Sequence, residues 1–410
     1  MLFISEVRVQ QRNNKGKLIF PFFRYFNIGD LEMALFRTRG RNRINILPQR
    51  YGNMSSDITA KDGNAAGGSG SGKSFFAGGD NYTGQTIDDG ITNEVNAFDV
   101  MTELYVSPLS TSRADLAVAD CPYQDTGYVV FAYGQSSFIN STVSNVVDVY
   151  DVDTGTRTST TFYESKTHVC GKGFYDGSYY IFLGGYGYDG NNQPSYSNVG
   201  EAVDSTLTRR MWSSSTLLDQ INEYMCSAIV YDSTNHYALF CYNNGTAIPQ
   251  LYTISDNFVF GDLTLTGLSG QVDNMAASTI KVDANTSYAL FAGGDNGSSS
   301  IIRGNKVGVI DNNLTYHTTL TLSVARTDLM GVELNTSCMF VGGISNSGRT
   351  NVIDVFDKYL TRYNNLILEY NTARPAVATV KDSTNNRVLG LVNDNNSTNY
   401  DNIEIFYENY

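Results

Sequence analysis

The chain has 410 residues and a formal net charge of −13, with 41% hydrophobic and 17% charged residues. This composition is typical of a folded globular protein, and no stretch approaches the roughly 18 apolar residues of a membrane span. Its five cysteines are odd in number and widely spaced, which indicates buried free thiols rather than a disulfide framework.

The charge is unevenly distributed along the chain. Residues 1–50 hold ten Lys and Arg against three Asp and Glu, so the remainder carries −20. Nucleic acid is an unlikely partner for such an acidic body, because that binding depends on neutralising phosphates. The basic start could face an acidic protein, nucleic acid or only solvent. Met1 is followed by no basic region and no long apolar region, so we expect synthesis in the cytoplasm without a signal peptide.

Residues 1–40 are predicted to form an arm, and residues 41–410 the main domain. Leu2–Gln10 and Lys17–Phe26 alternate as strands do, with turn residues between them, which predicts a β-hairpin. The hairpin either packs on the edge of the main domain or docks onto another chain. Its candidate contact residues are aromatic or basic: Phe20, Phe22, Phe23, Phe26, Arg37 and Arg39.

A repeated pattern covers the rest of the chain. In Asn285–Asp311 an apolar run closed by Gly293-Gly294 is followed by a polar loop and a second apolar run that ends in Asp311. The pattern recurs every 50 residues or so, a period that matches one kelch-type propeller blade of four strands. The other glycine-closed runs are Ser74–Gly79, Tyr180–Gly185 and Cys338–Gly343, with weaker copies at Val130–Gly134, Leu239–Asn243 and Val388–Val392.

These copies predict an all-β, seven-bladed β-propeller. The inner strand of the first blade is predicted at Asn53–Ala60. After the run Ile403–Tyr407 the sequence given leaves no room for a fourth strand, whereas Arg43–Pro48 is a strand without a blade. We therefore expect the N-terminal strand, at about residues 43–48, to complete the last blade and close the ring.

The chain resembles the kelch-repeat family through its double glycines, its aromatic-acidic pairs such as Phe98-Asp99, and arginines that open inner strands. It departs from the family at Tyr242-Asn243, where glycines belong, and it has one outer-strand tryptophan, Trp212. The resemblance spans residues 43–410 and implies a propeller. It leaves function open, because the family includes adaptors, enzymes and lectin-like binders.

Three matches to chemical sites are better explained as structure. Gly67–Ser74 has phosphate-loop spacing, but an apolar strand pattern follows it where the mechanism needs a helix. Asp151–Gly155 resembles the start of a calcium loop, yet it lacks a further acidic ligand and falls on a predicted turn. His168, His236 and His317 fall on different blades, so no metal site or cofactor is expected.

Long loops after the glycine-closed strands form the candidate ligand face. They are rich in residues that give flat amphipathic contacts and adaptable hydrogen bonds, suited to sugars or protein surfaces. Ordinary solvated loops are the alternative interpretation. The arginines are expected near the channel mouth on the same face, or else as structural groups that bond loop carbonyls. The candidates are Tyr82, Asp88, Asp89, Phe138, Tyr186, Tyr188, Asp189, Asn191, Asn192, Tyr196, Arg113, Arg326 and Arg374.

From these features we predict a non-catalytic binding protein, most simply a component of a virion such as a phage tail. Its arm would dock to other particle proteins, and its propeller face would bind a host-surface protein or glycan. A carbohydrate-active enzyme with a site at the channel mouth is the first alternative. An intracellular kelch adaptor is the second.

Overall fold

The computed structural model describes residues 47–51, 65–68, 73–77, 91, 93, 95–99, 102–104, 106–120, 127–137, 142–174, 178–188, 194–197, 199–204, 206–213, 225–243, 247–297, 300–382, 387–396 and 399–409. The chain divides into two compact units, Met1–Arg43 and Ile44–Tyr410. The predicted arm and its six contact residues lie outside the described residues. The described part is all-β, as predicted, with antiparallel sheets and one short 3-10 helix, η2 (Thr266–Leu268). It contains no helix that could span a membrane.

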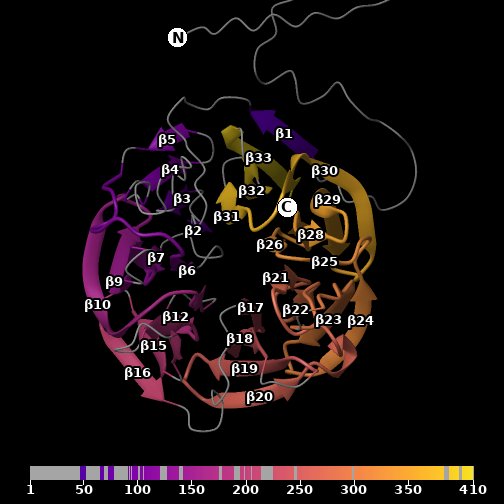
Figure 1. Ribbon diagram of the computed structural model, residues 1–410, viewed down its shortest axis with the longest axis horizontal. Helices are drawn as coiled ribbons and strands as arrows, with labels where there is room; N and C mark the ends of the chain where they lie inside the picture. Colours follow the sequence, from indigo (N-terminus) through magenta and orange to yellow (C-terminus); the bar gives the residue numbers. More distant parts are fainter. Residues whose placement is uncertain are drawn as a thin grey trace, which may run out of the picture. The chain divides into compact units, whose positions relative to one another are not determined.

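Seven main sheets of four antiparallel strands follow one another in chain order (Figure 1). The first strands are β2 (Ala65–Gly68), β6 (Ala117–Ala119), β11 (Cys170–Gly173), β17 (Cys226–Tyr231), β21 (Ala276–Lys281), β26 (Met330–Glu333) and β31 (Ala376–Asp382). The second strands are β3 (Lys73–Ala77), β7 (Tyr128–Ala132), β12 (Tyr180–Leu183), β18 (His236–Tyr242), β22 (Ser287–Ala292), β27 (Ser337–Val341) and β32 (Arg387–Asn396). The third strands are β4 (Val95–Asp99), β9 (Thr142–Asp151), β15 (Val199–Val203), β19 (Gln250–Ser255), β23 (Lys306–Asp311), β29 (Gly348–Asp357) and β33 (Asn399–Asn409).

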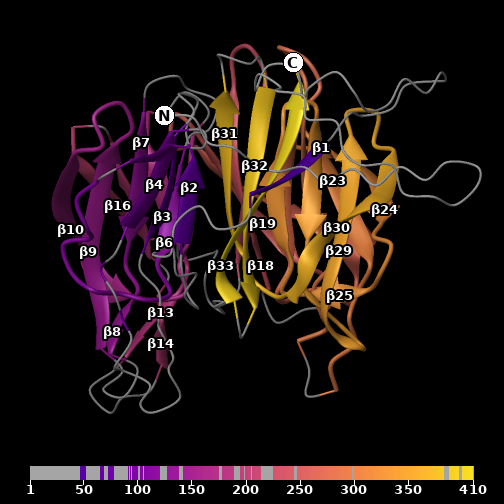
Figure 2. The same ribbon diagram turned by 90° about the horizontal axis from the view of Figure 1, so that it is seen from above.

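The fourth strands are β5 (Thr102–Leu104), β10 (Arg157–Lys166), β16 (Arg209–Ser213), β20 (Phe260–Thr264), β24 (Tyr316–Thr321), β30 (Arg362–Thr372) and β1 (Leu47–Tyr51). Short additional strands lie near the ends of the second and third strands: β8 (Gln135–Ser137), β13 (Tyr186–Tyr188), β14 (Pro194–Tyr196), β25 (Arg326–Thr327) and β28 (Ile344–Ser345). Figure 2 shows β8, β13, β14 and β25 toward the lower edge of that view.

The N-terminal strand belongs to the last sheet. β1 pairs with β33 in antiparallel register, from Leu47 opposite Tyr407 to Tyr51 opposite Ile403. The strand therefore lies a few residues later than the predicted range of about 43–48. This pairing covers an edge of β33 that would otherwise leave backbone groups without partners.

The first strands contact one another in sequence, from β2 to β6 and onward to β31, and β31 contacts β2. The core is divided among clusters that two consecutive sheets share. One such cluster joins Phe75 of β3 to Phe131 and Tyr150 of the next sheet, all of them buried. Each apolar side chain of this size contributes about 1.5–3 kcal/mol when it is fully buried.

Burial explains the strand sequences. In β23, Val307 to Ile310 are all buried, because a sheet covers each face. β24 alternates between exposed and half-buried residues, as an outer strand does. The first sheet corrects the prediction at Asn53–Ala60, since its first strand is β2, at Ala65–Gly68. β2 contacts both β6 and β31.

Aspartates at the ends of third strands stabilise the turns that follow by accepting hydrogen bonds from backbone N–H groups. Asp311 Oδ1 accepts hydrogen bonds from the backbone N–H groups of Asn313 and Thr315, at 2.9 and 3.0 Å. The next strand starts after Leu314, whose φ of +57° places it in the left-handed region while its side chain packs against the core. Such a turn with a left-handed residue is a common hairpin connection. Asp151 Oδ1 accepts similar hydrogen bonds from the backbone N–H groups of Asp153 and Thr154, so the calcium-loop resemblance is a turn.

Candidate functional site

At two of the double glycines, the second glycine bonds to a residue at or beyond the end of a fourth strand. Gly294 N–H donates to the carbonyl of Arg326 at 3.0 Å, and Gly343 N–H donates to the carbonyl of Thr372 at 2.8 Å. Gly343 has a φ of +106°, and a Cβ there would lie 2.7 Å from the Thr327 carbonyl oxygen. A side chain would block this approach, so the repeat needs glycine here. We call this end of the sheets the double-glycine end.

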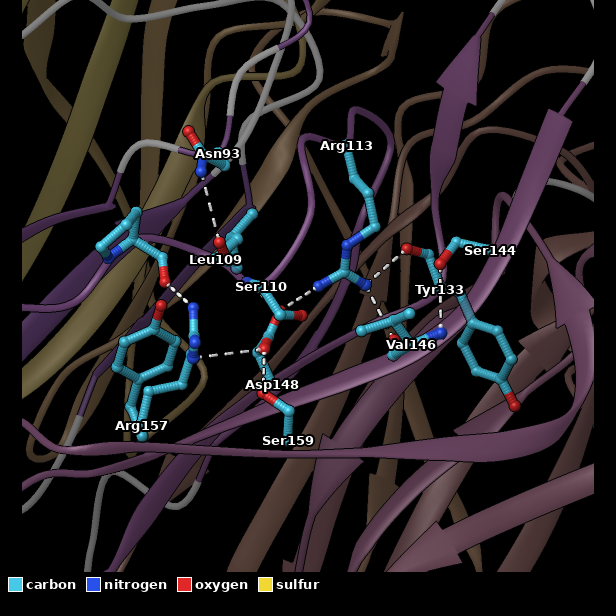
Figure 3. Close-up of polar contacts among 12 residues, drawn as sticks. Asn93, Leu109, Ser110, Arg113, Tyr133, Ser144, Val146, Asp148, Arg157 and Ser159 are labelled. Atoms are coloured by element: carbon cyan, nitrogen blue, oxygen red, sulfur yellow. Dashed lines mark hydrogen bonds and ion pairs between the residues drawn. The ribbon is translucent and has the colours of Figure 1, made fainter.

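Arg113 and Arg326 belong to the scaffold rather than to an accessible ligand face. Both side chains are fully buried. Arg113 Nη2 lies 2.5 Å from Asp148 Oδ2, and its Nη1 donates to the carbonyls of Tyr133 and Val146 (Figure 3). Arg326 pairs with Asp354 at 2.8 Å. Burial lowers the pKa of both guanidinium groups, and the aspartate opposite each one counteracts that effect. These contacts agree with the structural alternative for the two arginines.

Arg374 does not occupy the same repeat position as Arg326. The carbonyl that receives the glycine hydrogen bond belongs to Arg326 for Gly294 and to Thr372 for Gly343. Arg374 lies two residues later, with a side chain that is 58% exposed. Its Nε donates to Asp328 Oδ1 at 2.6 Å. Of the three predicted arginines, this one presents its side chain to solvent.

A set of left-handed residues precedes the first strands at the double-glycine end. Their φ angles lie between +51° and +55°. Left-handed residues other than glycine are uncommon, and their backbone strain often accompanies a functional site. Sequence reasoning named only Arg374 among them as a candidate and missed the other four, because the set shares a conformation and no residue type. They are Asp115, His168, Asn274, Asp328 and Arg374.

Three of the predicted ligand residues meet around one of these positions. The ring of Tyr186 stacks on His168 at a centroid distance of 5.1 Å and an interplanar angle of 18°. Tyr188 and Tyr196 contact Tyr186 edge-on, at 5.6 and 6.0 Å. Tyr186 is 9% exposed and Tyr196 is 48% exposed. We call these four residues the aromatic cluster. Tyr196 gives the aromatic cluster an accessible ring, and the buried Tyr186 ring supports it.

The segment Glu164–His168 supports the hairpin that carries the cluster. Thr167 and Tyr186 exchange two backbone hydrogen bonds, and a Cβ at Gly187 would lie 2.9 Å from the Ser165 carbonyl. Glu164 Oε2 accepts a hydrogen bond from Ser197 Oγ at 2.5 Å. The hairpin β13–β14 is therefore fixed along its length against the end of β10.

The remaining predicted ligand residues lie outside the described residues. They are Tyr82, Asp88, Asp89, Phe138, Asp189, Asn191 and Asn192.

The phosphate-loop match is a β-hairpin. β2 and β3 pair in antiparallel register, with Gly67 opposite Phe75 and Gly68 opposite Ser74. A phosphate loop requires a helix after the loop, and a strand stands there instead.

The histidines of the described residues belong to three different sheets. His168 stacks in the aromatic cluster, His236 Nδ1 lies 3.4 Å from Asp256 Oδ2, and His317 contacts Tyr288. Among the residues with described placement, no three His, Cys, Asp or Glu side chains come together as metal ligands would. This donor set does not fit a resident transition metal in that part of the chain.

No family model matches the chain, and no curated protein sequence matches it. A solved structure described as YjhT is similar at 13% identity and a TM-score of 0.49, covering 75% of this chain and 98% of that one. A fungal alcohol oxidase of the AA5 family, solved in complex with copper, is similar at 11% identity and a TM-score of 0.54. That match covers 86% of this chain and 75% of the oxidase. The likeness to the oxidase concerns the fold.

This likeness corrects the prediction that the chain is not an enzyme. A protein of the same fold is an alcohol oxidase, so a fold of this kind gives no ground for excluding catalysis. The prediction relied on the lack of a recognisable catalytic motif in the sequence. A site assembled from loops of different sheets leaves no such motif, so that reasoning was wrong.

Proposed function

We propose that the chain is a closed, seven-bladed β-propeller of kelch type whose double-glycine end binds carbohydrate. The fold proposal is supported by the seven main sheets, by the contact of β31 with β2, and by the pairing of β1 with β33. The double glycines, two of which make the equivalent backbone hydrogen bond through Gly294 and Gly343, support the kelch assignment.

The aromatic cluster carries the binding proposal. Sugar rings present C–H faces that stack on aromatic side chains, and their hydroxyls bond to polar groups at the edge of the ring. Tyr196 offers a half-exposed ring that contacts Tyr186 edge-on, and Tyr186 in turn stacks on His168. A pre-organised aromatic surface of this kind loses little conformational entropy on binding.

The test is a glycan array followed by calorimetric titration of the best ligand. Tyr196→Ala should weaken binding about tenfold, because one aromatic contact contributes on the order of 0.5–1.5 kcal/mol. Tyr359→Ala is the matched control, since Tyr359 is 70% exposed and lies in the turn between β29 and β30, away from the cluster in the sequence. Equal losses in the two variants, or no glycan binding by the wild type, would contradict the proposal. Product analysis of each bound glycan shows whether binding leads to turnover.

The role in a virion, its particle and host-surface partners and the cytoplasmic synthesis stay predictions. Deleting residues 1–40 should leave a folded propeller that no longer joins an assembly.

A further inference from the structure

The strand that precedes the aromatic cluster, β10, ends in a buried cation, Lys166, whose contacts differ from those of the buried arginines. Gly134 N–H donates to the carbonyl of Lys166 as Gly294 N–H does to that of Arg326, so the two residues are equivalent. Arg326 lies 2.8 Å from the acid of its own sheet, Asp354. Lys166 Nζ lies 3.8 Å from the corresponding acid, Glu201, and 3.1 Å from Glu164.

Glu201 is fully buried and has other partners. Its Oε2 accepts from the Tyr133 hydroxyl at 2.6 Å, and its Oε1 accepts from the backbone N–H of Tyr163 at 2.7 Å. The Lys166 ammonium donates to the Val199 carbonyl at 2.8 Å, and the nearer of its two carboxylates is Glu164, which is partly exposed. Lys166 itself is 1% exposed, and burial lowers its pKa.

Glu164 is held in a fixed position beside the aromatic cluster. Its Oε2 receives the ammonium of Lys166 and the hydroxyl of Ser197, the residue after Tyr196. Its side chain is 39% exposed. Within the part of the chain that the structure describes, Oε1 makes no hydrogen bond or ion pair. A carboxylate oxygen can accept hydrogen bonds from more than one hydroxyl group.

We propose that Glu164 is the polar recognition group of the aromatic cluster, and that the site binds neutral sugars and excludes acidic ones. This inference rests on the proposed carbohydrate-binding function. Glu164 Oε1 accepts hydrogen bonds from ring hydroxyls while Tyr196 stacks on the C–H face. A uronic acid would bring a second carboxylate toward Glu164, on a chain whose net charge is already −13. Two like charges at such a short distance repel each other. A partly buried site screens this repulsion less than bulk water does.

The experiment titrates the full chain with paired neutral and uronic-acid oligosaccharides of equal length. Wild type should bind the neutral member at least tenfold more tightly. Glu164→Gln should weaken neutral binding by about tenfold or more, since a hydrogen bond to a charged group contributes about 1.5–3 kcal/mol. The same variant should reduce the difference in affinity between the neutral and the acidic sugars. Ser197→Ala, which removes one hydrogen bond to Glu164, should give a smaller loss in the same direction.

Glu369→Gln is the matched control, because Glu369 is an exposed carboxylate on β30 of another sheet. Thermal unfolding of each variant shows whether the fold is intact. If Tyr196→Ala weakens binding but Glu164→Gln binds both sugars as wild type does, the selector role is wrong and the binding proposal stands. If no sugar of either kind binds, both proposals are overturned.

Discussion

Two sheets of this protein place a cation at the same repeat position and use it for different purposes. In the sheet of β26, β27, β29 and β30, Arg326 is buried against Asp354 and serves the scaffold. At the end of β10, in the sheet that also contains β6, β7 and β9, the buried Lys166 pairs with Glu164 of the same strand, just before the segment that leads into the aromatic cluster. A flexible ammonium can be shared between two carboxylates, whereas a planar guanidinium is suited to a fixed geometry. The same repeat position therefore carries a structural cation in Arg326 and a cation that supports the candidate site in Lys166.

The largest expected effect comes from removing the scaffold acid. Asp354→Ala leaves Arg326 buried without its carboxylate, which typically costs about 3–5 kcal/mol of unfolding free energy. Urea unfolding measures the loss. Asp328→Ala is the control, because its partner Arg374 is 58% exposed, and such surface pairs contribute about 0–1 kcal/mol. Similar losses in the two variants would show that the buried ion pair contributes no more to stability than the exposed one.

A smaller effect is expected at Tyr133. Its hydroxyl donates the short hydrogen bond to Glu201 Oε2, from which the Lys166 ammonium lies farther away. Tyr133→Phe removes a hydrogen bond to a buried carboxylate and should cost about 1.5–3 kcal/mol at neutral pH. Burial and the nearby Glu201 raise the pKa of the Tyr133 hydroxyl well above its ordinary value of 10.0. The folded state thus favours the protonated form, and this contribution to stability is complete below pH 10 and is lost as the pH rises further.

Wild type should therefore lose stability above pH 10 more steeply than Tyr133→Phe does. Urea unfolding at neutral pH and across the alkaline range checks both parts. Tyr359→Phe, at an exposed position, serves as the control. Parallel alkaline curves for wild type and Tyr133→Phe would show that this hydroxyl does not contribute to the decline.

The last effect, which overlaps in size with the previous one, concerns the double glycine that follows β27. Gly343→Ala should cost about 1–3 kcal/mol from backbone strain, and more where the new Cβ meets the Thr327 carbonyl. Gly348 is a matched control with the same φ of +106° and open space around it. The difference between the two variants in thermal unfolding isolates the steric part. Equal losses of stability would mean that the close approach of Gly343 to the Thr327 carbonyl adds no steric cost.

Much of the fold could be predicted because it is a local pattern. The run before Gly293 and the run before Asp311 are the strands β22 and β23, and their repetition predicted antiparallel sheets in chain order. The prediction failed at the first sheet, where the Gly- and Ala-rich stretch Ala65–Gly68 forms a strand. Strand propensity is low for such residues, and the strand depends on contacts with β6 and β31.

The candidate site was only partly accessible to sequence reasoning. The tyrosines Tyr186, Tyr188 and Tyr196 were recognisable because amphipathic aromatic residues crowd one loop. His168 was set aside as one of three scattered histidines, and Arg374 was grouped with Arg113 and Arg326. Sequence spacing alone could not separate these positions, because the connections that precede the first strands differ in length.

The sequence by itself determined the all-β class and the repeat, because strand periodicity, glycine pairs and turn aspartates are written within a few residues. Only the tertiary structure decided which charges are scaffold and which serve the site. Arg113, Lys166 and Arg326 look alike as basic residues before a strand, and their roles follow from the carboxylates that other strands bring to them. Those strands lie 28 or more residues away along the chain, except for Glu164, which turns Lys166 toward the aromatic cluster.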